Sequence, residues 1–230
     1  KLWTDLHSNI HHNQMGELNQ WIEHAKKTVD FWPVAYYPLY MKRTETGAGL
    51  EDLYDREQIE QDWEQLREAV KQQNEAGYPM FMGYEWQGSG EDGDHNVFFL
   101  DNEQPMLHPM RYEELYQAYK DRTAIAIPHH VAYQLGSRGK NWETHREAFS
   151  PFAEIYSSHG CSENDTGPFD MERHLHMGPR TGETCYERGI EKGYLVGMIA
   201  SGDNHNVPAV HDHGTMCVLV ADGSKEAIWE

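Results

Sequence analysis

Histidine and carboxylate side chains recur along this chain where predicted strands end. Most of them follow a short apolar run by one or two residues. They occupy six segments: Asp5-Leu6-His7, Tyr84-Glu85-Trp86, Asp94-His95-Asn96, Pro128-His129-His130, Glu154 with His159, and Asp203-Asn204-His205. In an α/β fold, the carboxyl ends of parallel strands meet at one face, where ligands and catalytic groups collect. The pattern predicts a site with several metal ligands, and imidazole together with carboxylate suits zinc, manganese or iron.

Predicted strands and helices alternate along the chain. Apolar runs predict strands at residues 1–6, 30–35, 79–86, 96–100, 123–127, 152–156, 194–200 and 215–220. Periodic apolar positions predict helices at residues 17–29, 55–76, 112–119 and 180–192, and polar, glycine-containing segments predict loops at 41–54 and 157–179. This alternation is typical of a mostly parallel sheet or barrel. We expect residues 1–230 to form a single domain of a polypeptide that continues past Glu230, because the last predicted helix is cut there.

The composition excludes some classes of function. The 230 residues contain 19 basic and 38 acidic side chains, which give a formal net charge of −19. Binding to nucleic acid is not expected, because it needs a basic face. No run of about 18 apolar residues is present, so no membrane span is expected. We expect a soluble, cytoplasmic or periplasmic protein that acts on a small molecule, and its oligomeric state stays open.

Several motifs, in this order, match the pattern of one superfamily. They are Asp5-Leu6-His7, Gly83-Tyr84-Glu85, Ile127-Pro128-His129, Glu154-Ile155-Tyr156, Ser158-His159-Gly160 and Asp203-Asn204-His205. The chain thereby resembles the PHP (polymerase and histidinol phosphatase) superfamily of metal-dependent phosphoesterases, and most of all an uncharacterised bacterial branch of it. The resemblance implies a distorted (β/α)7 barrel. It also implies a hydrolase that uses a metal-activated water on a phosphoester or another ester-type small molecule.

The resemblance implies one to three divalent metal ions and a set of ligands. The implied ligands are His7, Asn9, Glu85, His95, His129, Asp203 and His205. Glu85 would bridge two ions, and His205 would belong to a third. The sequence departs from the superfamily at Asn9, where a histidine is usual, and at Tyr36-Tyr37, where an Asp-His pair is usual. Asparagine offers only a neutral oxygen, so these departures weaken the third metal site.

Other residues have predicted roles in catalysis or substrate binding. His159 or His130 is predicted to donate a proton to the leaving group. Glu154 is predicted to support the site or contact the substrate. The predicted substrate-binding residues are Tyr37, Arg138 and Arg180, because guanidinium groups near the predicted loops could hold a phosphate, sulfate or carboxylate.

Two other classes of function fit the sequence. Asn9 and Tyr36-Tyr37 favour a degenerate barrel that binds a metal or ligand without turnover. A metal-dependent lyase acting on an acidic sugar, with Tyr36 or Tyr37 as the base, is a further alternative. Whether His11 or His12 replaces the absent donors is left open by the sequence.

Overall fold

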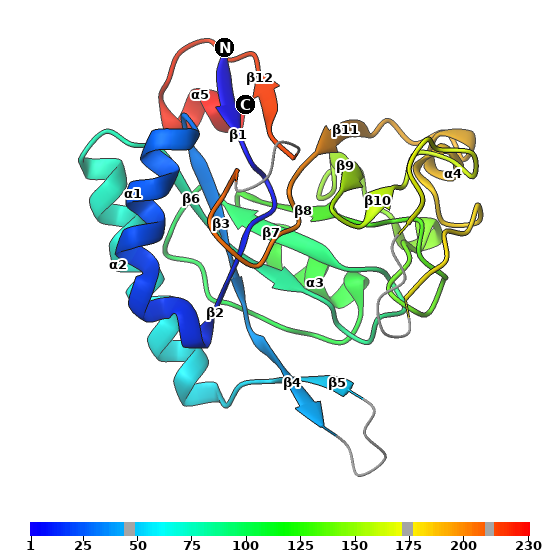
Figure 1. Ribbon diagram of the computed structural model, residues 1–230, viewed down its shortest axis with the longest axis horizontal. Helices are drawn as coiled ribbons and strands as arrows, with labels where there is room; N and C mark the ends of the chain where they lie inside the picture. The colour runs from blue at the N-terminus through cyan, green and yellow to red at the C-terminus, as the bar shows by residue number, and fades with distance from the viewer. Residues whose placement is uncertain (44–48, 172–176, 210–213) are drawn as a thin grey trace.

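The largest sheet of the protein has five strands. The computed structural model describes residues 1–43, 49–171, 177–209 and 214–230. The strands lie in the order β2-β3-β6-β7-β8. Their bounds are Asn9–His11 for β2, Trp32–Tyr37 for β3, Met80–Trp86 for β6, His95–Phe99 for β7 and Ala124–Pro128 for β8. The first three strands are parallel, whereas β7 runs antiparallel to both of its neighbours (Figure 1).

Helices pack against one face of this sheet. They are α1 (Leu18–Thr28), α2 (Arg56–Glu75) and α3 (Tyr112–Tyr119). The apolar residues of α2, Trp63, Leu66 and Val70, recur at helical spacing and are buried. The Asp55 side chain accepts a hydrogen bond from the Gln58 N–H and so caps the start of this helix. The main hydrophobic core therefore lies between the helices and the sheet.

Smaller elements complete the fold. A second sheet has the order β10-β9-β11, and two further pairs are β1-β12 and β4-β5. The bounds of these elements are Leu2–Thr4 (β1), Leu39–Arg43 (β4), Gly49–Leu53 (β5), Phe152–Ser157 (β9), Gly160–Cys161 (β10), Gly197–Ala200 (β11), Met216–Val218 (β12), Tyr186–Glu191 (α4) and Lys225–Trp229 (α5), with 3-10 helices at His12–Glu17 and Trp142–Thr144. The β4-β5 hairpin extends away from the body of the protein (Figure 1).

The predicted (β/α)7 barrel is wrong. The strands form several small sheets rather than one closed barrel, and the described residues contain only five α-helices. The cause lies partly in the segment 87–94, which joins β6 to β7 without a helix. A short connection returns the chain antiparallel, because a parallel partner needs a crossover of a dozen or more residues. The fold is therefore mixed α/β.

The predicted elements were otherwise largely found. The helix predictions at 17–29, 55–76 and 112–119 agree with α1, α2 and α3 to within a few residues. The helix predicted at 180–192 is confirmed only at its end, as α4. The loop predicted at 41–54 is wrong for the described part of that segment, because β4 and β5 pair there as an antiparallel hairpin, and residues 44–48 lie outside the described residues. Because that segment is polar, the search for apolar runs did not predict its strands.

The two faces of the large sheet carry different side chains. In β3, Trp32, Val34 and Tyr36 face the helices, whereas Ala35 belongs to the core of the opposite face. In β6, Glu85 lies opposite Asn96 of β7, and the next residue, Trp86, lies opposite His95. Directly paired residues share a face of a sheet, so Glu85 and His95 lie on opposite faces. The face that carries Glu85 is also the face that carries the candidate site.

Among the described residues, no helix combines the length and the apolar character that crossing a membrane requires.

Candidate metal site

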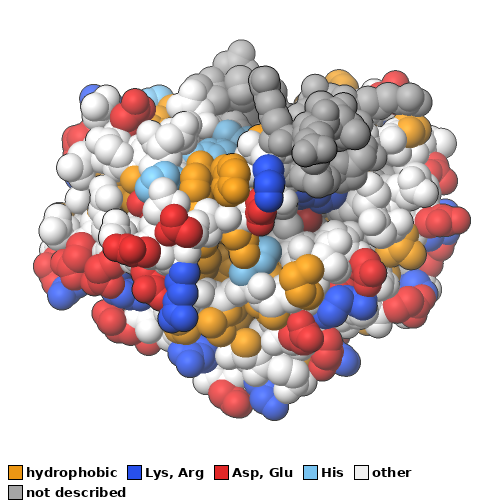
Figure 2. Space-filling model, turned by 90° about the horizontal axis from the view of Figure 1, so that it is seen from below, with side chains coloured by type: hydrophobic (Ala, Val, Ile, Leu, Met, Phe, Trp, Pro, Cys, Tyr) orange, Lys and Arg blue, Asp and Glu red, His pale blue; other side chains and the backbone are white. Residues whose placement is uncertain are grey.

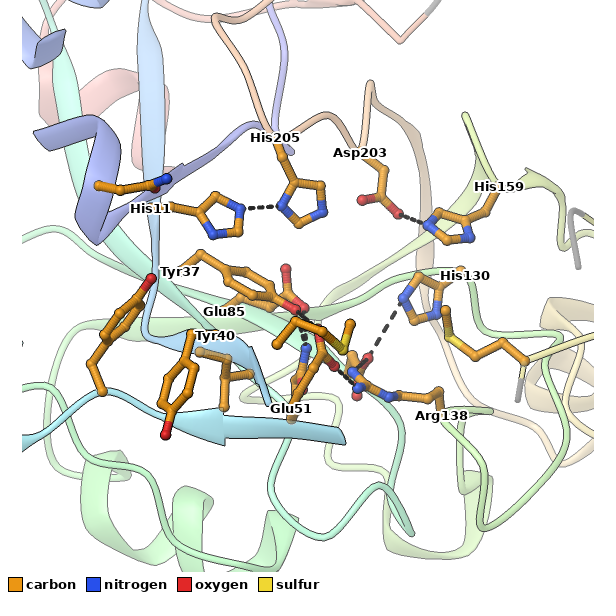
Figure 3. Close-up of a pocket in the computed structure, with 17 residues that line it drawn as sticks. His11, Tyr37, Tyr40, Glu51, Glu85, His130, Arg138, His159, Asp203 and His205 are labelled. Carbon is orange, nitrogen blue, oxygen red and sulfur yellow. Dashed lines mark hydrogen bonds and ion pairs between the residues drawn. The ribbon is translucent and has the colours of Figure 1, made fainter. Parts of the chain in front are cut away.

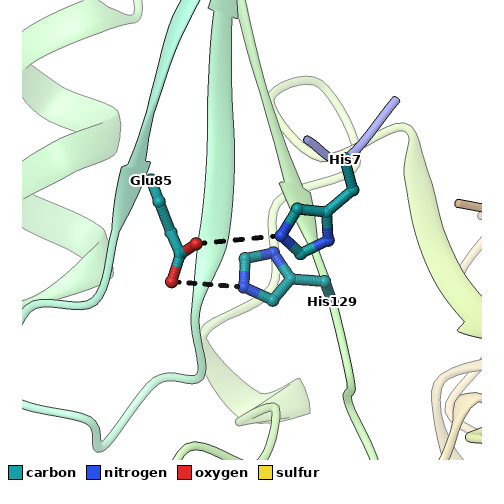
Figure 4. A group of neighbouring side chains, drawn as sticks. All are labelled: His7, Glu85 and His129. Atoms are coloured by element: carbon teal, nitrogen blue, oxygen red, sulfur yellow. Dashed lines mark ion pairs between the residues drawn. The ribbon is translucent and has the colours of Figure 1, made fainter. Parts of the chain in front are cut away.

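Three residues from distant parts of the chain meet beside the large sheet. His7 follows β1, Glu85 lies near the end of β6, and His129 follows β8 (Figure 4). The His7 Nε2 atom lies 3.7 Å from Glu85 Oε2, and the His129 Nε2 atom lies 3.7 Å from Glu85 Oε1. All three side chains are buried. One potential ligand atom from each lies within 4.8 Å of the others, so the three form a group that could hold a metal ion.

The spacing of these atoms suits a metal ion better than hydrogen bonds. Both ring nitrogens of His129 are buried and have no hydrogen-bond partner among the described residues. A distance of 3.7 Å is too long for a hydrogen bond. Two ligands bound about 2.1 Å from one tetrahedral zinc ion lie roughly 3.4 Å apart. A histidine with two unpartnered buried nitrogens is costly, and a bound cation would remove part of that cost.

Glu154 orients the His7 ring through Nδ1, the ring nitrogen that does not face Glu85. The His7 Nδ1 atom lies 2.8 Å from Glu154 Oε2, which also accepts a hydrogen bond from the Ser201 hydroxyl. Burial lowers the pKa of His7, but the carboxylates of Asp203 and Glu154 outweigh it and hold that pKa well above its ordinary value. The same negative field would favour a divalent cation in place of the proton. The arrangement leaves His7 Nε2 directed toward Glu85 and Asp203.

Asp203 joins the group through a contact between two loops. Its Oδ1 atom lies 3.3 Å from His7 Nε2. The buried Asp5 side chain accepts hydrogen bonds from the backbone N–H groups of His7, Gly202 and Ala209. Asp5 thus fixes the segments on both sides of this contact. The sequence placed Asp5 in a motif but gave it no role; its position two residues before His7 was the available signal.

His130 and His159 lie next to Asp203. The structure brings one ligand atom from each of these three residues to within 4.8 Å of the others. His130 also belongs to a group with Asp94 and His129. In Figure 3, His130, His159 and Asp203 lie together along one side of the pocket. The predicted catalytic residues His130, His159 and Glu154 are therefore all close to the metal-binding group.

Asn9 lies beside the same group. Its Nδ2 atom donates a hydrogen bond to Glu85 Oε2 over 2.6 Å and lies 3.4 Å from His7 Nε2. Its Oδ1 atom is buried, and no residue in the described part of the chain gives it a hydrogen bond. Asn9 therefore lies beside the group with its amide nitrogen toward Glu85 and His7, and its predicted role as a ligand stays a prediction.

The structure does not bring His95 into any of these groups. His95 lies on the opposite face of the sheet, where its ring stacks on Tyr112 and its Nε2 atom lies 3.2 Å from Lys140 Nζ. Its Nδ1 atom lies 2.8 Å from the Gly93 carbonyl oxygen. This orientation follows from the antiparallel direction of β7, whereas the sequence prediction assumed a barrel of parallel strands. The predicted ligand role of His95 has no geometric support.

His205 lies at a second position on the pocket wall. Its Nδ1 atom is 2.6 Å from His11 Nε2, and both rings contact the ring of Tyr37 (Figure 3). Of His11 and His12, His11 is therefore the one that lies where it could replace the metal ligands that the sequence motifs lack. His12 instead lies 2.7 Å from Asp62, and Tyr36 donates its hydroxyl hydrogen to the same carboxylate.

A cavity of about 380 Å³ opens beside the candidate metal site. Its lining includes Tyr37, Glu51, Arg138, His159 and Asp203. This volume suits a small molecule. Figure 2 shows acidic side chains spread widely over one face of the protein, with histidines and hydrophobic side chains exposed near its centre.

The predicted substrate-binding residues separate into two groups. Tyr37 and Arg138 line the cavity. The Arg138 guanidinium pairs with Asp94 and with Glu51, and Tyr37 donates a hydrogen bond to Glu51. Arg180 is not among the described residues that line the cavity, and its guanidinium donates hydrogen bonds to the backbone carbonyls of Cys161, Asp165, Gly167 and Phe169. Arg180 therefore stabilises the loop to which these four carbonyls belong.

A scan against protein-family models and a search of curated proteins found no match to this chain.

Proposed function

We propose that this protein is a metal-dependent hydrolase that acts on a phosphoester or another ester-type small molecule. The observation that carries this proposal is the group of His7, Glu85 and His129. Its donor atoms are buried and lie at spacings close to those of metal ligands, and among the described residues neither ring nitrogen of His129 has a hydrogen-bond partner. The order of the sequence motifs, which resembles the PHP superfamily, supports the same function independently of the rejected barrel.

The residues around the group have complementary tasks in this proposal. His7 Nε2, His129 and Glu85 would hold the cation, and Asn9 and Asp203 lie close enough to assist. Glu154 orients His7 through its Nδ1 atom, which is a common arrangement around metal-bound histidines. When bound, the cation would polarise the substrate and lower the pKa of a water molecule toward neutrality.

The cavity would position the substrate next to the cation. Tyr37 and Arg138 line it, and Gln87 donates hydrogen bonds to both the Tyr37 hydroxyl and Glu85 Oε1. These links connect the proposed substrate contacts with the proposed metal ligand. A shift of Tyr37 on substrate binding would therefore be transmitted to Glu85.

Hydrolysis assays test the proposal. The wild-type protein, loaded with Zn²⁺, Mn²⁺ or Fe²⁺, is screened against phosphate monoesters, phosphate diesters and carboxylic esters, and Glu85→Gln is screened beside it. We expect turnover of at least one ester class, reduced at least about a hundredfold in Glu85→Gln, because metal-ion catalysis supplies several kcal/mol. The exposed Glu75→Gln variant is the matched control and should keep full activity. A protein that binds the ion but hydrolyses no ester would point to the binding module instead.

The lyase alternative receives less support from the tyrosines. Burial, together with Glu85 and Glu51, raises the pKa of Tyr37 well above its ordinary value. Burial and the hydrogen bond to Asp62 also raise the pKa of Tyr36. A higher pKa makes the phenolate scarcer at neutral pH, so neither tyrosine is suited to act as the base.

A further inference from the structure

We propose that the cavity binds an ammonium group at its end next to the β4-β5 hairpin, so that the ester acted on carries a positively charged nitrogen a few atoms from its scissile bond. The proposal adds a substrate class to the proposed hydrolase function, on which it rests. None of the residues that would bind this group is one of the three proposed to hold the metal ion. They are Tyr37, Tyr40, Glu51, Tyr54 and Asp94.

Apart from its histidines, the charged side chains of the cavity are mostly acidic. Arg138 is the only lysine or arginine among the described residues of its lining, whereas four carboxylates line it, those of Glu51, Glu85, Asp94 and Asp203. One guanidinium and one divalent cation would therefore leave a surplus of one negative charge. Figure 3 shows Glu51 and Arg138 across the pocket from Asp203. A cavity with a surplus of one sign of charge attracts a ligand of the opposite sign.

At the hairpin end of the cavity, two carboxylates share one guanidinium. The Arg138 guanidinium donates a hydrogen bond to Asp94 Oδ2 over 2.7 Å and also pairs with Glu51. One positive charge cannot neutralise both carboxylates, and a substrate anion would have to displace one of them to reach Arg138. This end of the cavity therefore suits a cation better than the phosphate, sulfate or carboxylate that the sequence suggested as a partner of Arg138.

Asp94 has a carboxylate oxygen that the described residues leave unsatisfied. The side chain lines the cavity and is 1% exposed, and no described residue gives its Oδ1 atom a hydrogen bond. A buried carboxylate oxygen without a partner is costly, so a positive charge beside it would be stabilising. The nearby Arg138 guanidinium would repel a divalent ion at this oxygen about twice as strongly as a singly charged ammonium group, because the Coulomb energy scales with charge.

Three tyrosines line the same cavity. Tyr37 is buried and donates its hydroxyl hydrogen to Glu51, whereas Tyr40 is exposed and Tyr54 is half-buried. The ring centroids of Tyr40 and Tyr54 lie 5.1 Å apart, so the two rings form one continuous aromatic surface. The face of a tyrosine ring attracts cations, and proteins that recognise quaternary ammonium groups use aromatic rings for this purpose. Aromatic rings beside unneutralised carboxylates therefore favour an alkylated ammonium group over a metal ion.

Short contacts connect the ammonium position with the proposed metal ligand. Tyr37 donates a hydrogen bond to Glu51 Oε1 over 2.5 Å. Gln87 Nε2 donates over 2.8 Å to the Tyr37 hydroxyl and over 2.9 Å to Glu85 Oε1. The Glu51 and Glu85 carboxylates are thus separated by only three hydrogen bonds, which places both within reach of one small molecule. An ester whose oxygen and nitrogen are joined by a two-carbon linker, as in choline esters, fits this spacing.

Three small alcohols that differ in charge test the proposal. They are choline, which is a cation; dimethylbutanol, its neutral analogue in which a carbon atom replaces the nitrogen; and hydroxypropanoate, an anion. The affinity of the zinc-loaded full chain for each is measured by isothermal titration. We expect choline to bind at least about tenfold more tightly than dimethylbutanol, because only choline gains the attraction of the carboxylates and the tyrosine rings. Equal affinity for these two alcohols, or tightest binding of hydroxypropanoate, would overturn the proposal.

Glu51→Gln and Asp52→Asn are a matched pair of variants. Each removes one negative charge from β5, but Glu51 lines the cavity, whereas the exposed Asp52 pairs with Lys42 and is not among the described lining residues. We expect Glu51→Gln to weaken choline binding at least about tenfold and to leave dimethylbutanol binding unchanged. Asp52→Asn should change neither affinity. Choline affinity that is unchanged in Glu51→Gln, or that falls equally in both variants, would contradict a site at Glu51.

Zinc content separates the failure of this site from the failure of the proposed function. Bound zinc per chain is measured for each protein, and Glu51→Gln should hold as much zinc as the wild type. Choline is also titrated into the metal-free wild-type protein. A chain that binds zinc but does not prefer choline would overturn only the ammonium site. A chain that prefers choline but binds no zinc would keep the ammonium site and overturn the metal-dependent function.

Discussion

Glu154 determines which nitrogen of His7 faces the proposed cation. It accepts the Nδ1 hydrogen of His7, and Ser201 and the His130 backbone N–H hold the carboxylate in place. Removing the charge while keeping the shape should loosen this orientation. We expect Glu154→Gln to weaken metal affinity about 10- to 100-fold, as for other partners of metal-bound histidines. Isothermal titration with Zn²⁺ measures the change. Equal affinity in Glu154→Gln and in the exposed control Glu75→Gln would contradict this role.

Lys140 should make stability depend on pH. It is buried, and burial lowers its pKa from an ordinary value of 10.5 to about 7, although nearby Asp92 favours the charged form. Between these pH values the unfolded chain binds a proton that the folded protein does not. The free energy of unfolding should therefore rise with pH over this range, by at most about 1.4 kcal/mol per pH unit from this group.

Lys140→Met isolates this contribution. Urea unfolding of the wild-type protein and of the variant is measured from pH 6 to pH 10. We expect the unfolding free energy of the wild type to rise relative to that of Lys140→Met as pH increases above about 7. Parallel pH profiles would show that Lys140 stays charged in the folded protein.

Single residues were predicted from the sequence with uneven success. His7, Glu85, His129 and Asp203 could be brought together because each lies near or just after the end of a strand. His95 instead begins β7, and it lies on the opposite face because neighbouring residues of a strand point to opposite faces of the sheet. The position of Asp5 beneath the loop of Asp203 depends on contacts across about two hundred residues, which no local pattern encodes.

At the level of elements, the β4-β5 hairpin is joined to the site through Glu51, which contacts both the Arg138 guanidinium and the Tyr37 hydroxyl. Arg138 pairs with Glu51 of the hairpin and with the buried Asp94. We expect Arg138→Met to speed hydrogen exchange of the amides in residues 39–43 and 49–53 by at least about tenfold, which corresponds to about 1.4 kcal/mol. Arg56→Met, which removes an exposed pair with Glu60, should leave this exchange unchanged. Equal protection in Arg138→Met would mean that the ion pair does not hold the hairpin.

The hairpin also shows where prediction of elements from the sequence stops. Apolar periodicity located α1, α2 and α3, because each buries one stripe of side chains against the sheet. Tyr40, Met41 and Asp52 of the hairpin are exposed, so the segment shows no buried stripe and looks like a polar loop. Its strands are held by backbone pairing between Leu39 and Leu53 and between the residues that follow, which the side-chain pattern does not reveal.

At the scale of the whole molecule, the alternation of strands and helices suggested a barrel that the structure does not contain. The convergence of the motifs did not require a barrel. The parallel strands β3 and β6, together with β8, end on one side of the sheet, and the segments after β1, β9 and β11 meet them there. Several of the predicted ligands therefore meet at this edge although the predicted barrel does not form, and their binding of a metal stays a prediction.

The metal content of the native protein tests the central claim most directly. The protein is purified without added metal or chelator, and Zn, Mn and Fe are measured per chain by plasma mass spectrometry. The account predicts at least one equivalent in the wild-type protein, retained in Glu75→Gln and lost in Glu85→Gln. It also predicts that added metal raises the melting temperature, because a ligand that binds only the folded state stabilises it. A wild-type protein that contains no metal, and that no divalent ion stabilises, would contradict the account.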